Sequence, residues 1–193
     1  MGKPGSLIVV LLCAGLVGCG STRAKEPEIS STPAAPTSFE TFTLTGGDVS
    51  FPYPADWHLE RRQPPGVATA ATGGASFTVW AYRSQVLVAD PASQARALKD
   101  LITSLKGRDP GFQLQSVTQQ QRFGTPAFEI IGMTTINGHR VKVRSDHIYR
   151  GRGEYVVDQI ADPAQFSRVN TEVFEPLLAG IRLLGDPPAP QGG

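Results

Sequence analysis

The chain has 193 residues, with 18 Lys and Arg side chains against 17 Asp and Glu, and two cysteines, Cys13 and Cys19. This balance of charge argues against broad electrostatic binding to nucleic acid or to anionic lipid. Because both cysteines precede residue 20, the domain that follows has no disulfide and no thiol. Redox, iron–sulfur and cysteine-nucleophile functions are therefore excluded for it.

The N-terminal segment has the pattern of a secretory signal. Lys3 precedes an apolar run over residues 6–17, which is shorter than the roughly 20 apolar residues that span a bilayer. The run ends in Leu-Val-Gly-Cys, which resembles the bacterial lipobox. The resemblance implies a lipoprotein signal peptide over residues 1–18 and a lipid (palmitate) on Cys19. A cleaved signal in which Cys19 is incidental is the alternative.

Composition divides the remaining chain into three parts. Residues 19–38 comprise the lipidated cysteine and a stretch rich in Ser, Thr, Ala and Pro, which is typical of a flexible spacer. Residues 39–185 are enough for one globular domain. The tail 186–193 is rich in Pro and Gly, and we expect it to be disordered. The lipid would anchor the chain to the cell membrane, facing the extracytoplasmic side.

Short strand patterns open the globular domain. Residues 39–44, 49–53 and 57–61 are predicted strands that turn-forming residues separate. The Pro- and Gly-rich residues 63–74 predict a mobile loop or lid, and a further strand follows over residues 75–83.

Two helices are predicted. Asp90 as N-cap and Pro91 as first helical residue start one helix, which ends before Gly107. Its predicted apolar stripe consists of Ala95, Leu98, Leu101, Ile102 and Leu105. The second helix is predicted to begin at Asp162-Pro163, and Pro176 within it predicts a kink or a restart.

Between the helices the pattern is that of an antiparallel meander. Its predicted strands cover residues 113–123, 127–136, 139–150 and 154–161. Asn137-Gly138 predicts a two-residue type I′ hairpin turn. The domain is therefore predicted to have an α+β fold with a central antiparallel sheet.

The hairpin at residues 137–138 sets a register in which Glu129 lies opposite Asp146. A three-residue turn after Arg150 would also place Asp146 opposite Asp158. One face would then carry an acidic row, Glu129, Asp146 and Asp158, beside a basic stripe, Arg140, Lys142 and Arg144. Opposed like charges are unfavourable in a sheet. The row therefore indicates an ion-paired solvated face, a recognition surface for a protein or an anionic glycan, a divalent-cation site, or a different register.

Two aromatic residues form a second candidate surface. Trp80 and Tyr82 share one face of the predicted strand 75–83. They could line a groove beside residues 63–74, where a small apolar ligand or a partner peptide would bind. Packing within the core explains the same pattern.

Several motifs resemble the PsbP/DcrB-type superfamily. Residues 49–57 read Val-Ser-Phe-Pro-Tyr-Pro-Ala-Asp-Trp, residues 124–129 read Gly-Thr-Pro-Ala-Phe-Glu, and residues 155–157 read Tyr-Val-Val. With the lipobox and the spacer, the chain most resembles the LpqN-type lipoproteins of actinobacterial envelopes. The resemblance implies a PsbP-like α/β/α sandwich with two main helices flanking the sheet. It also implies an accessory, assembly or binding role without a shared catalytic apparatus.

No nucleophile elbow, phosphate-binding loop, dinucleotide fingerprint or metal-spaced His/Cys cluster occurs in the sequence. His147 shares a predicted strand face with Val141, Val143 and Tyr149, which favours a hydrogen-bonded core histidine. We therefore expect no enzyme activity, cofactor or metal, although a hydrolase with a dispersed site remains as a third hypothesis.

The predicted function is a non-enzymatic binding or protein-interaction module of the cell envelope. Its partner would be an envelope or host protein, or a small apolar ligand, and not nucleic acid. The alternative is a small-molecule or lipid carrier that uses a pocket between the sheet and a helix. The predicted binding surface consists of Trp80, Tyr82, Arg140, Lys142 and Arg144.

Overall fold

The computed structural model describes residues 35–44, 48–84 and 86–183. The predicted signal peptide, Cys19, most of the spacer and the tail 186–193 lie outside these described residues. None of the helices within the described ranges is long and apolar enough to cross a membrane.

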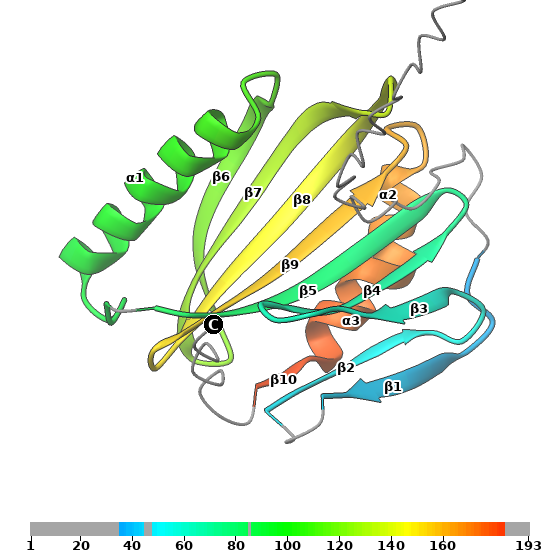
Figure 1. Cartoon of the computed structure of the whole chain (residues 1–193), viewed down its shortest axis with the longest axis horizontal. Helices are drawn as coiled ribbons and strands as arrows, with labels where there is room; N and C mark the ends of the chain where they lie inside the picture. The colour runs from blue at the N-terminus through cyan, green and yellow to red at the C-terminus, as the bar shows by residue number, and fades with distance from the viewer. Residues whose placement is uncertain (1–34, 45–47, 85, 184–193) are drawn as a thin grey trace, which may run out of the picture.

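Seven antiparallel strands form one curved sheet in the order β3-β4-β5-β9-β8-β7-β6 (Figure 1). They are β3 (His58–Arg61), β4 (Gly66–Thr72), β5 (Ala75–Arg83), β6 (Gln113–Arg122), β7 (Thr125–Ile136), β8 (His139–Arg150) and β9 (Gly153–Ala161). All connections are hairpins except that between β5 and β6, which crosses the sheet from its middle to one edge. This crossing contains α1 (Pro91–Arg108). We call the face that α1 covers the α1 face.

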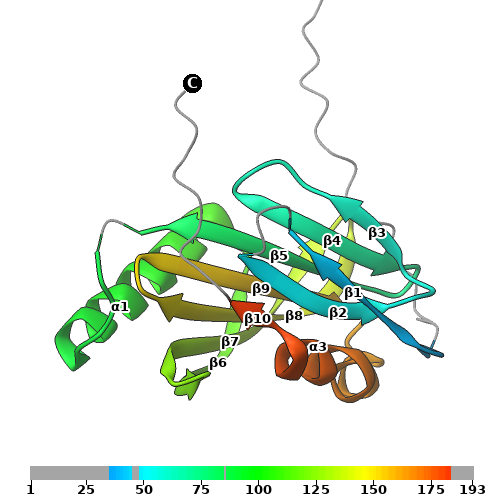
Figure 2. The same ribbon diagram turned by 90° about the horizontal axis from the view of Figure 1, so that it is seen from below.

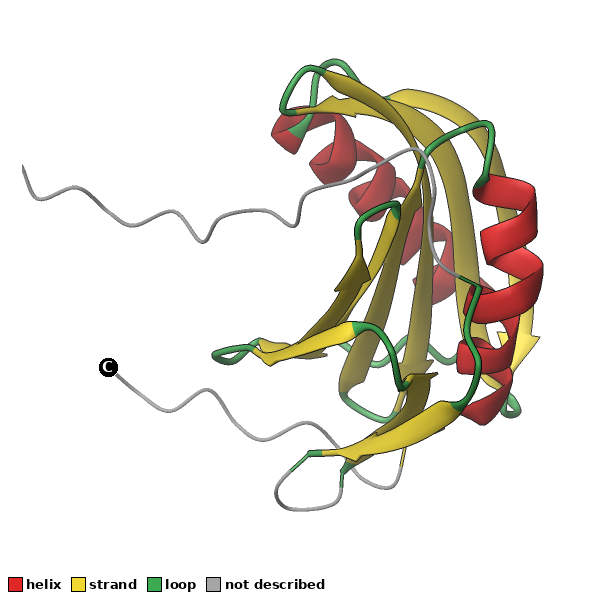
Figure 3. Cartoon of the chain, turned by 90° about the vertical axis from the view of Figure 1, so that its right-hand side faces the viewer, coloured by secondary structure: helices red, strands yellow, loops and turns green. Residues whose placement is uncertain are grey.

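The opposite face carries the C-terminal elements and a small second sheet. The small sheet has the order β1-β2-β10, with β1 (Phe39–Thr43), β2 (Val49–Pro54) and β10 (Arg182–Leu183). The helical elements are α2 (Phe166–Val169), the π-helical turn η1 (Asn170–Phe174) and α3 (Glu175–Gly180). Figure 2 shows α3 leading into β10 beside β2, and Figure 3 shows helices on both sides of the curved sheet. The predicted α+β fold with a central antiparallel sheet and helices on its two faces is confirmed.

The main core lies between the large sheet, the small sheet and the C-terminal helices. Phe51 and Phe77 are fully buried, with ring centroids 5.8 Å apart, and Trp57 lies 6.0 Å from Phe77. Phe174 and Leu177 close this core from the helical side. The aromatic positions of the 49–57 motif therefore pack the core.

Helix α1 begins as the sequence predicts. Asp90 accepts hydrogen bonds from the backbone N–H groups of Ala92 and Ser93 at 2.9 and 3.0 Å, and Pro91 is the first helical residue. The predicted apolar stripe is partly wrong, because Ala95 is exposed and Leu101 is the buried residue of the helix. The half-buried residues that pack beside Leu101 are Ala97, Leu98 and Leu105.

The C-terminal helix begins at Phe166, later than predicted, because Asp162 first forms a turn in which it accepts from the N–H of Ala164. The predicted restart at Pro176 is confirmed. Before it, η1 widens the helix, and the N–H of Glu175 donates to the carbonyl of Asn170. Pro176 then falls in the first turn of α3, where the N–H group that proline lacks would form no hydrogen bond within that turn.

The predicted loop over residues 63–74 is wrong. The segment contains β4, which pairs with β3 on one side and with β5 on the other. Val67, Ala68 and Ala70 are buried. A strand of small Ala and Thr side chains flanked by Gly and Pro carries a weak apolar pattern, and its place between two strands determines its structure.

The first predicted register is confirmed and the second is wrong. Asn137 and Gly138 have φ angles of 50° and 82°, as a type I′ turn requires, and Glu129 pairs with Asp146. The β8–β9 turn has two residues, however, so Asp146 pairs with Val157. A slip of one residue moves each side chain to the other face. Asp158 therefore leaves the predicted acidic row and lies on the α1 face.

Candidate functional site

A cleft of about 910 Å³ lies between α1 and the large sheet. We call it the α1 cleft. Its floor is formed by β8 and β9, with contributions from β5 and β7, its wall by α1, and part of its rim by Val86 and Val88 of the β5–α1 connection. Helix α1 contacts the sheet through a small apolar cluster that contains Leu101, Phe128 and Tyr149. This limited contact leaves room for the cleft.

Eleven of the 25 side chains around the α1 cleft are apolar. They are Val86, Val88, Ala97, Leu101, Leu105, Phe112, Ile130, Ile136, Val143, Val156 and Ile160. Pockets for small molecules typically combine such a lining with a few polar groups that fix the orientation of the ligand.

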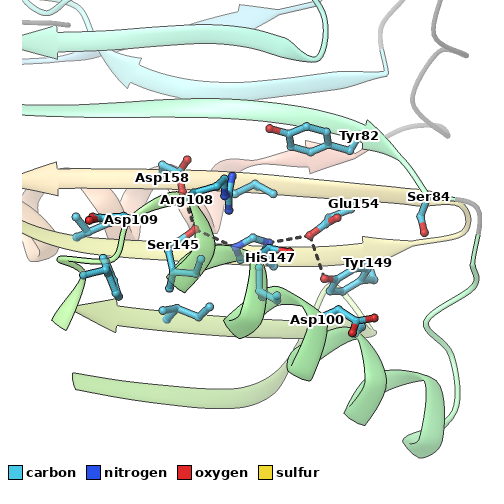
Figure 4. A pocket seen from close by; sticks show the side chains of 18 of the residues that line it. Tyr82, Ser84, Asp100, Arg108, Asp109, Ser145, His147, Tyr149, Glu154 and Asp158 are labelled. Atoms are coloured by element: carbon cyan, nitrogen blue, oxygen red, sulfur yellow. Dashed lines mark hydrogen bonds and ion pairs between the residues drawn. The ribbon is translucent and has the colours of Figure 1, made fainter. Parts of the chain in front are cut away.

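A chain of hydrogen-bonding side chains crosses the floor of the α1 cleft (Figure 4). Ser145 Oγ donates to Asp158 Oδ1 at 2.6 Å and lies 3.1 Å from His147 Nε2. His147 Nδ1 lies 2.8 Å from Glu154 Oε1, which also accepts from the Tyr149 hydroxyl at 3.0 Å. All five residues line the cleft. The floor thus carries an ordered polar strip among apolar side chains.

The strip keeps Glu154 charged. Burial alone would raise the pKa of Glu154, but the hydrogen bond and charge of His147, with the hydrogen bond from Tyr149, outweigh it and lower the pKa. The pKa of Tyr149 is raised, mainly by burial and then by the charge and hydrogen bond of Glu154. Tyr82 also has a raised pKa, because it is partly buried and lies near the charge of Asp158.

Ser145, His147 and Glu154 are linked side chain to side chain as the nucleophile, base and acid of a catalytic triad are. Other features of such a site are missing. The Ser145 hydroxyl donates to Asp158, at a shorter distance than its contact with His147. An acyl-transfer site also needs N–H donors for the oxyanion. The backbone of β8 around Ser145 pairs with β7 and β9, so it offers no such donors. The geometry suits binding better than acyl transfer.

The structure separates the predicted binding surface onto the two faces of the sheet. Trp80 and Tyr82 lie on the α1 face with their rings stacked 6.3 Å apart. Tyr82 lines the α1 cleft, and Trp80 Nε1 donates to Asp158 Oδ2 at 2.9 Å. The groove that Tyr82 lines is thus under α1, whereas the sequence placed it beside residues 63–74.

The three basic residues of that surface lie on the opposite face and have different environments. Arg140 is exposed and donates to Gln113 at 3.0 Å, and Lys142 Nζ lies 4.9 Å from the ring centroid of Phe166. Arg144 is only 3% exposed. Because its guanidinium is buried among the carboxylates of Glu129, Asp146 and Glu175, Arg144 is not available to an exposed surface.

Ion pairs hold together the charged cluster that the hairpin register creates, and Arg122 also pairs with Asp146 at 3.3 Å. Arg144 bridges Glu129 and Asp146 at 2.8 Å each, and it also donates to Glu175. Burial would lower the pKa of Arg144, but the charge of Asp146 and the hydrogen bonds to Glu175 and Asp146 raise it above its ordinary value. This corresponds to the ion-paired alternative for the predicted row, in a buried rather than a solvated setting. Within residues 35–44, 48–84 and 86–183, no three His, Cys, Asp or Glu residues are placed to hold a metal ion.

The prediction of a hydrogen-bonded core histidine is confirmed, because His147 is 6% exposed and contacts Ser145 and Glu154. Sequence reasoning did not identify the polar strip to which it belongs. Alternation along β8 places Ser145, His147 and Tyr149 on one face. Adding the residues of β9 required the correct register, which the predicted three-residue turn after Arg150 did not give.

These elements define a PsbP-like α+β fold with an open cleft under one helix. No family model matches the sequence, and no curated protein matches it. The chain is similar to the solution structure of cyanobacterial PsbP (CyanoP) from Synechocystis sp. PCC 6803, with a TM-score of 0.59 and 9% identity over 82% of this chain and 98% of that one.

Two further solved structures have the same fold. LpqN of Mycobacterium tuberculosis, described as involved in cell envelope biogenesis, has a TM-score of 0.51 and 15% identity over 80% of this chain and 90% of that chain. The Saccharomyces cerevisiae Ran-binding protein Mog1p has a TM-score of 0.51 and 12% identity over 76% of this chain and 96% of its own. At these identities the comparisons show the fold and not the function.

Proposed function

We propose that this chain is a non-enzymatic binding protein of the cell envelope that holds a small ligand in the α1 cleft. The volume of the cleft, about 910 Å³, carries the proposal, because it lies within the range of small-molecule sites. Eleven apolar side chains line the cleft, while the polar strip offers fixed groups for orientation. This proposal combines the two functions predicted from the sequence, a binding module of the cell envelope and a small-molecule or lipid carrier.

The similar structures support a binding role. They include a Ran-binding protein and a protein involved in cell envelope biogenesis. The lack of oxyanion donors along β8 further favours binding over catalysis. An envelope or host protein as an additional partner stays a prediction.

The cleft is tested by comparing two substitutions on α1. Ser104 lines the α1 cleft, whereas its exposed neighbour Thr103 does not. We expect Ser104→Trp to fill the cleft and Thr103→Trp to leave it open. The full chain would be isolated from its host in polymer-bounded lipid discs, and its bound compounds would be identified by mass spectrometry.

The expected result is a compound of small-molecule size that accompanies the wild type and Thr103→Trp but not Ser104→Trp. Equal recovery from all three proteins would contradict the proposed site. The site would also be contradicted if no specific compound accompanied the wild type and if hexyltrimethylammonium, hexanesulfonate and 1-hexanol all failed to bind it.

We also propose that the lipid on Cys19 anchors the protein to the extracytoplasmic side of the membrane. The Leu-Val-Gly-Cys motif supports this proposal. In the host, Cys19→Ala should abolish the mass of the lipid and release the protein from the membrane fraction. Retention of the unlipidated variant in that fraction would contradict the anchor.

A further inference from the structure

We propose that the α1 cleft selects a cationic amphiphile, a ligand with an amine or quaternary ammonium group at one end and an apolar body. This inference rests on the proposed function and specifies the ligand of the same site. It follows from the surroundings of Glu154, from the distribution of charge around the cleft, and from the space that remains for an apolar body.

Glu154 lies between two tyrosines. It pairs directly with Tyr82 of β5 on one side and with Tyr149 of β8 on the other. All three side chains line the α1 cleft, as Figure 4 shows. Tyr149 contributes its hydroxyl, while its ring is buried against Phe128. A carboxylate beside the half-buried ring of Tyr82 suits a cation, because the charge and the aromatic ring both attract it. Trp80 stacks on Tyr82 from outside the lining of the cleft and supports its ring.

One oxygen of Glu154 remains available to a ligand. Oε1 accepts from both His147 and Tyr149. Across the part of the chain that the structure describes, no hydrogen bond or ion pair reaches Oε2. The side chain is 25% exposed, so a bound group can reach it. Asp158 differs, because Ser145 and Trp80 occupy both of its oxygens.

The distribution of charge favours a cation at this point. The lining contains four carboxylates, from Asp100, Asp109, Glu154 and Asp158, and two guanidinium groups, from Arg96 and Arg108. Both arginines are exposed on α1, whereas Glu154 and Asp158 belong to the floor. His147 is the remaining basic group, and Glu154 and Ser145 already engage its two nitrogens.

Arg108 is the main competitor for Glu154. It is close enough for its charge to act on both Glu154 and Tyr82. It forms no ion pair with a carboxylate among the described residues. Arg108 should therefore weaken the binding of a cation and would favour an anionic ligand if the proposal were wrong. This opposition makes Arg108 a useful position for the test.

The apolar body has room beyond the charged end. Val88, Leu101, Leu105 and Val156 line the same cleft. Val86 on the rim is 54% exposed, and a ligand that extends past it would cover this side chain. Burial of such surface contributes about 25 cal/mol per Å², so an apolar chain should add affinity to that of the charged group.

The test compares three probes with the same six-carbon chain: hexyltrimethylammonium, hexanesulfonate and 1-hexanol. Each is titrated calorimetrically into the full chain in lipid discs, with empty discs as the blank. The wild type should bind hexyltrimethylammonium about tenfold or more tightly than hexanesulfonate, which corresponds to about 1.4 kcal/mol. Equal or tighter binding of the sulfonate would overturn the proposal.

Substitutions locate the charge selection. Glu154→Gln keeps the size of the side chain and should weaken the binding of hexyltrimethylammonium about tenfold. Arg108→Gln should strengthen that binding. Glu60→Gln, on the exposed strand β3, is the control and should change nothing. Tyr82→Leu should weaken ammonium binding but not hexanol binding, which keeps the test valid if Glu154→Gln unfolds. Unchanged ammonium binding in a folded Glu154→Gln or in Tyr82→Leu would overturn the proposal.

The outcomes also separate this inference from the proposed function. If the probes bind the wild type but not Ser104→Trp, and show no preference for the cation, the cleft is a binding site and the charge selection is wrong. If no probe binds the wild type and its cleft holds no compound, both proposals are wrong.

Discussion

The polar side chains on the two faces of the large sheet have opposite environments. On the face toward α2 and α3, Arg144 and Asp146 are 3% and 0% exposed, and their charges are paired within the core. On the α1 face, the polar strip from Asp158 to Tyr149 borders a cleft. The same alternating strands supply both sets. What differs is the layer above them, which is closely packed on one face and open on the other.

The largest expected effect separates structural charge from exposed charge on one strand. Arg144→Met removes the cation that Glu129, Glu175 and the fully buried Asp146 share, and leaves Asp146 only the longer ion pair with Arg122 at 3.3 Å. It should lower the free energy of unfolding by about 3–5 kcal/mol. Arg140→Ala, on the exposed end of β8, should change it by less than about 0.5 kcal/mol. Urea unfolding of both variants measures the difference. Similar losses would show that the ion-pair cluster is not a special feature of the packed face.

A pair of leucines tests the packing of the two layers. Leu178 of α3 is fully buried, so Leu178→Ala should cost about 3 kcal/mol of unfolding free energy. Leu101 of α1 borders a space that is already open, so Leu101→Ala should lose mainly its transfer free energy, about 1.5 kcal/mol. Equal losses in urea unfolding would mean that α1 is packed as closely as α3.

Acid should affect the α1 face through Glu154. Its pKa is lower in the folded protein than its ordinary value of 4.5, so its contribution to stability is full above that value. The contribution is lost as the pH falls below 4.5 through the folded pKa. Unfolding midpoints measured from neutral to acidic pH should therefore fall less steeply for Glu154→Gln than for the wild type. Parallel curves would show that the bonds from His147 and Tyr149 do not stabilise the carboxylate.

Local signals in the sequence predicted much of the fold. The Asp90-Pro91 start of α1, the Asn137-Gly138 hairpin and the restart at Pro176 each depend on residues that are close in the chain. The errors arose where the structure depends on contacts between residues that are distant in the sequence. Strand β4 is stabilised by both of its neighbours, and the face of Asp158 depends on the length of one turn.

The candidate site was predicted only in part for the same reason. Tyr82 and the buried His147 could be placed on strand faces by alternation. Their meeting with Glu154 required the pairing of β9 with both β5 and β8. The burial of Arg144 likewise depends on Glu175 in α3, which lies 31 residues away in the sequence.

The position of β9 also has a consequence for the order of folding. It is the last strand of the large sheet to be synthesised, yet it lies in the middle, between β5 and β8. Hairpins join β3 to β5 and β6 to β8, whereas the contact between Trp80 and Asp158 spans 78 positions. Loops of that length close late, because their entropic cost precedes any gain from contacts. The two halves of the sheet can thus form first, and β9 then joins them and completes the floor of the cleft.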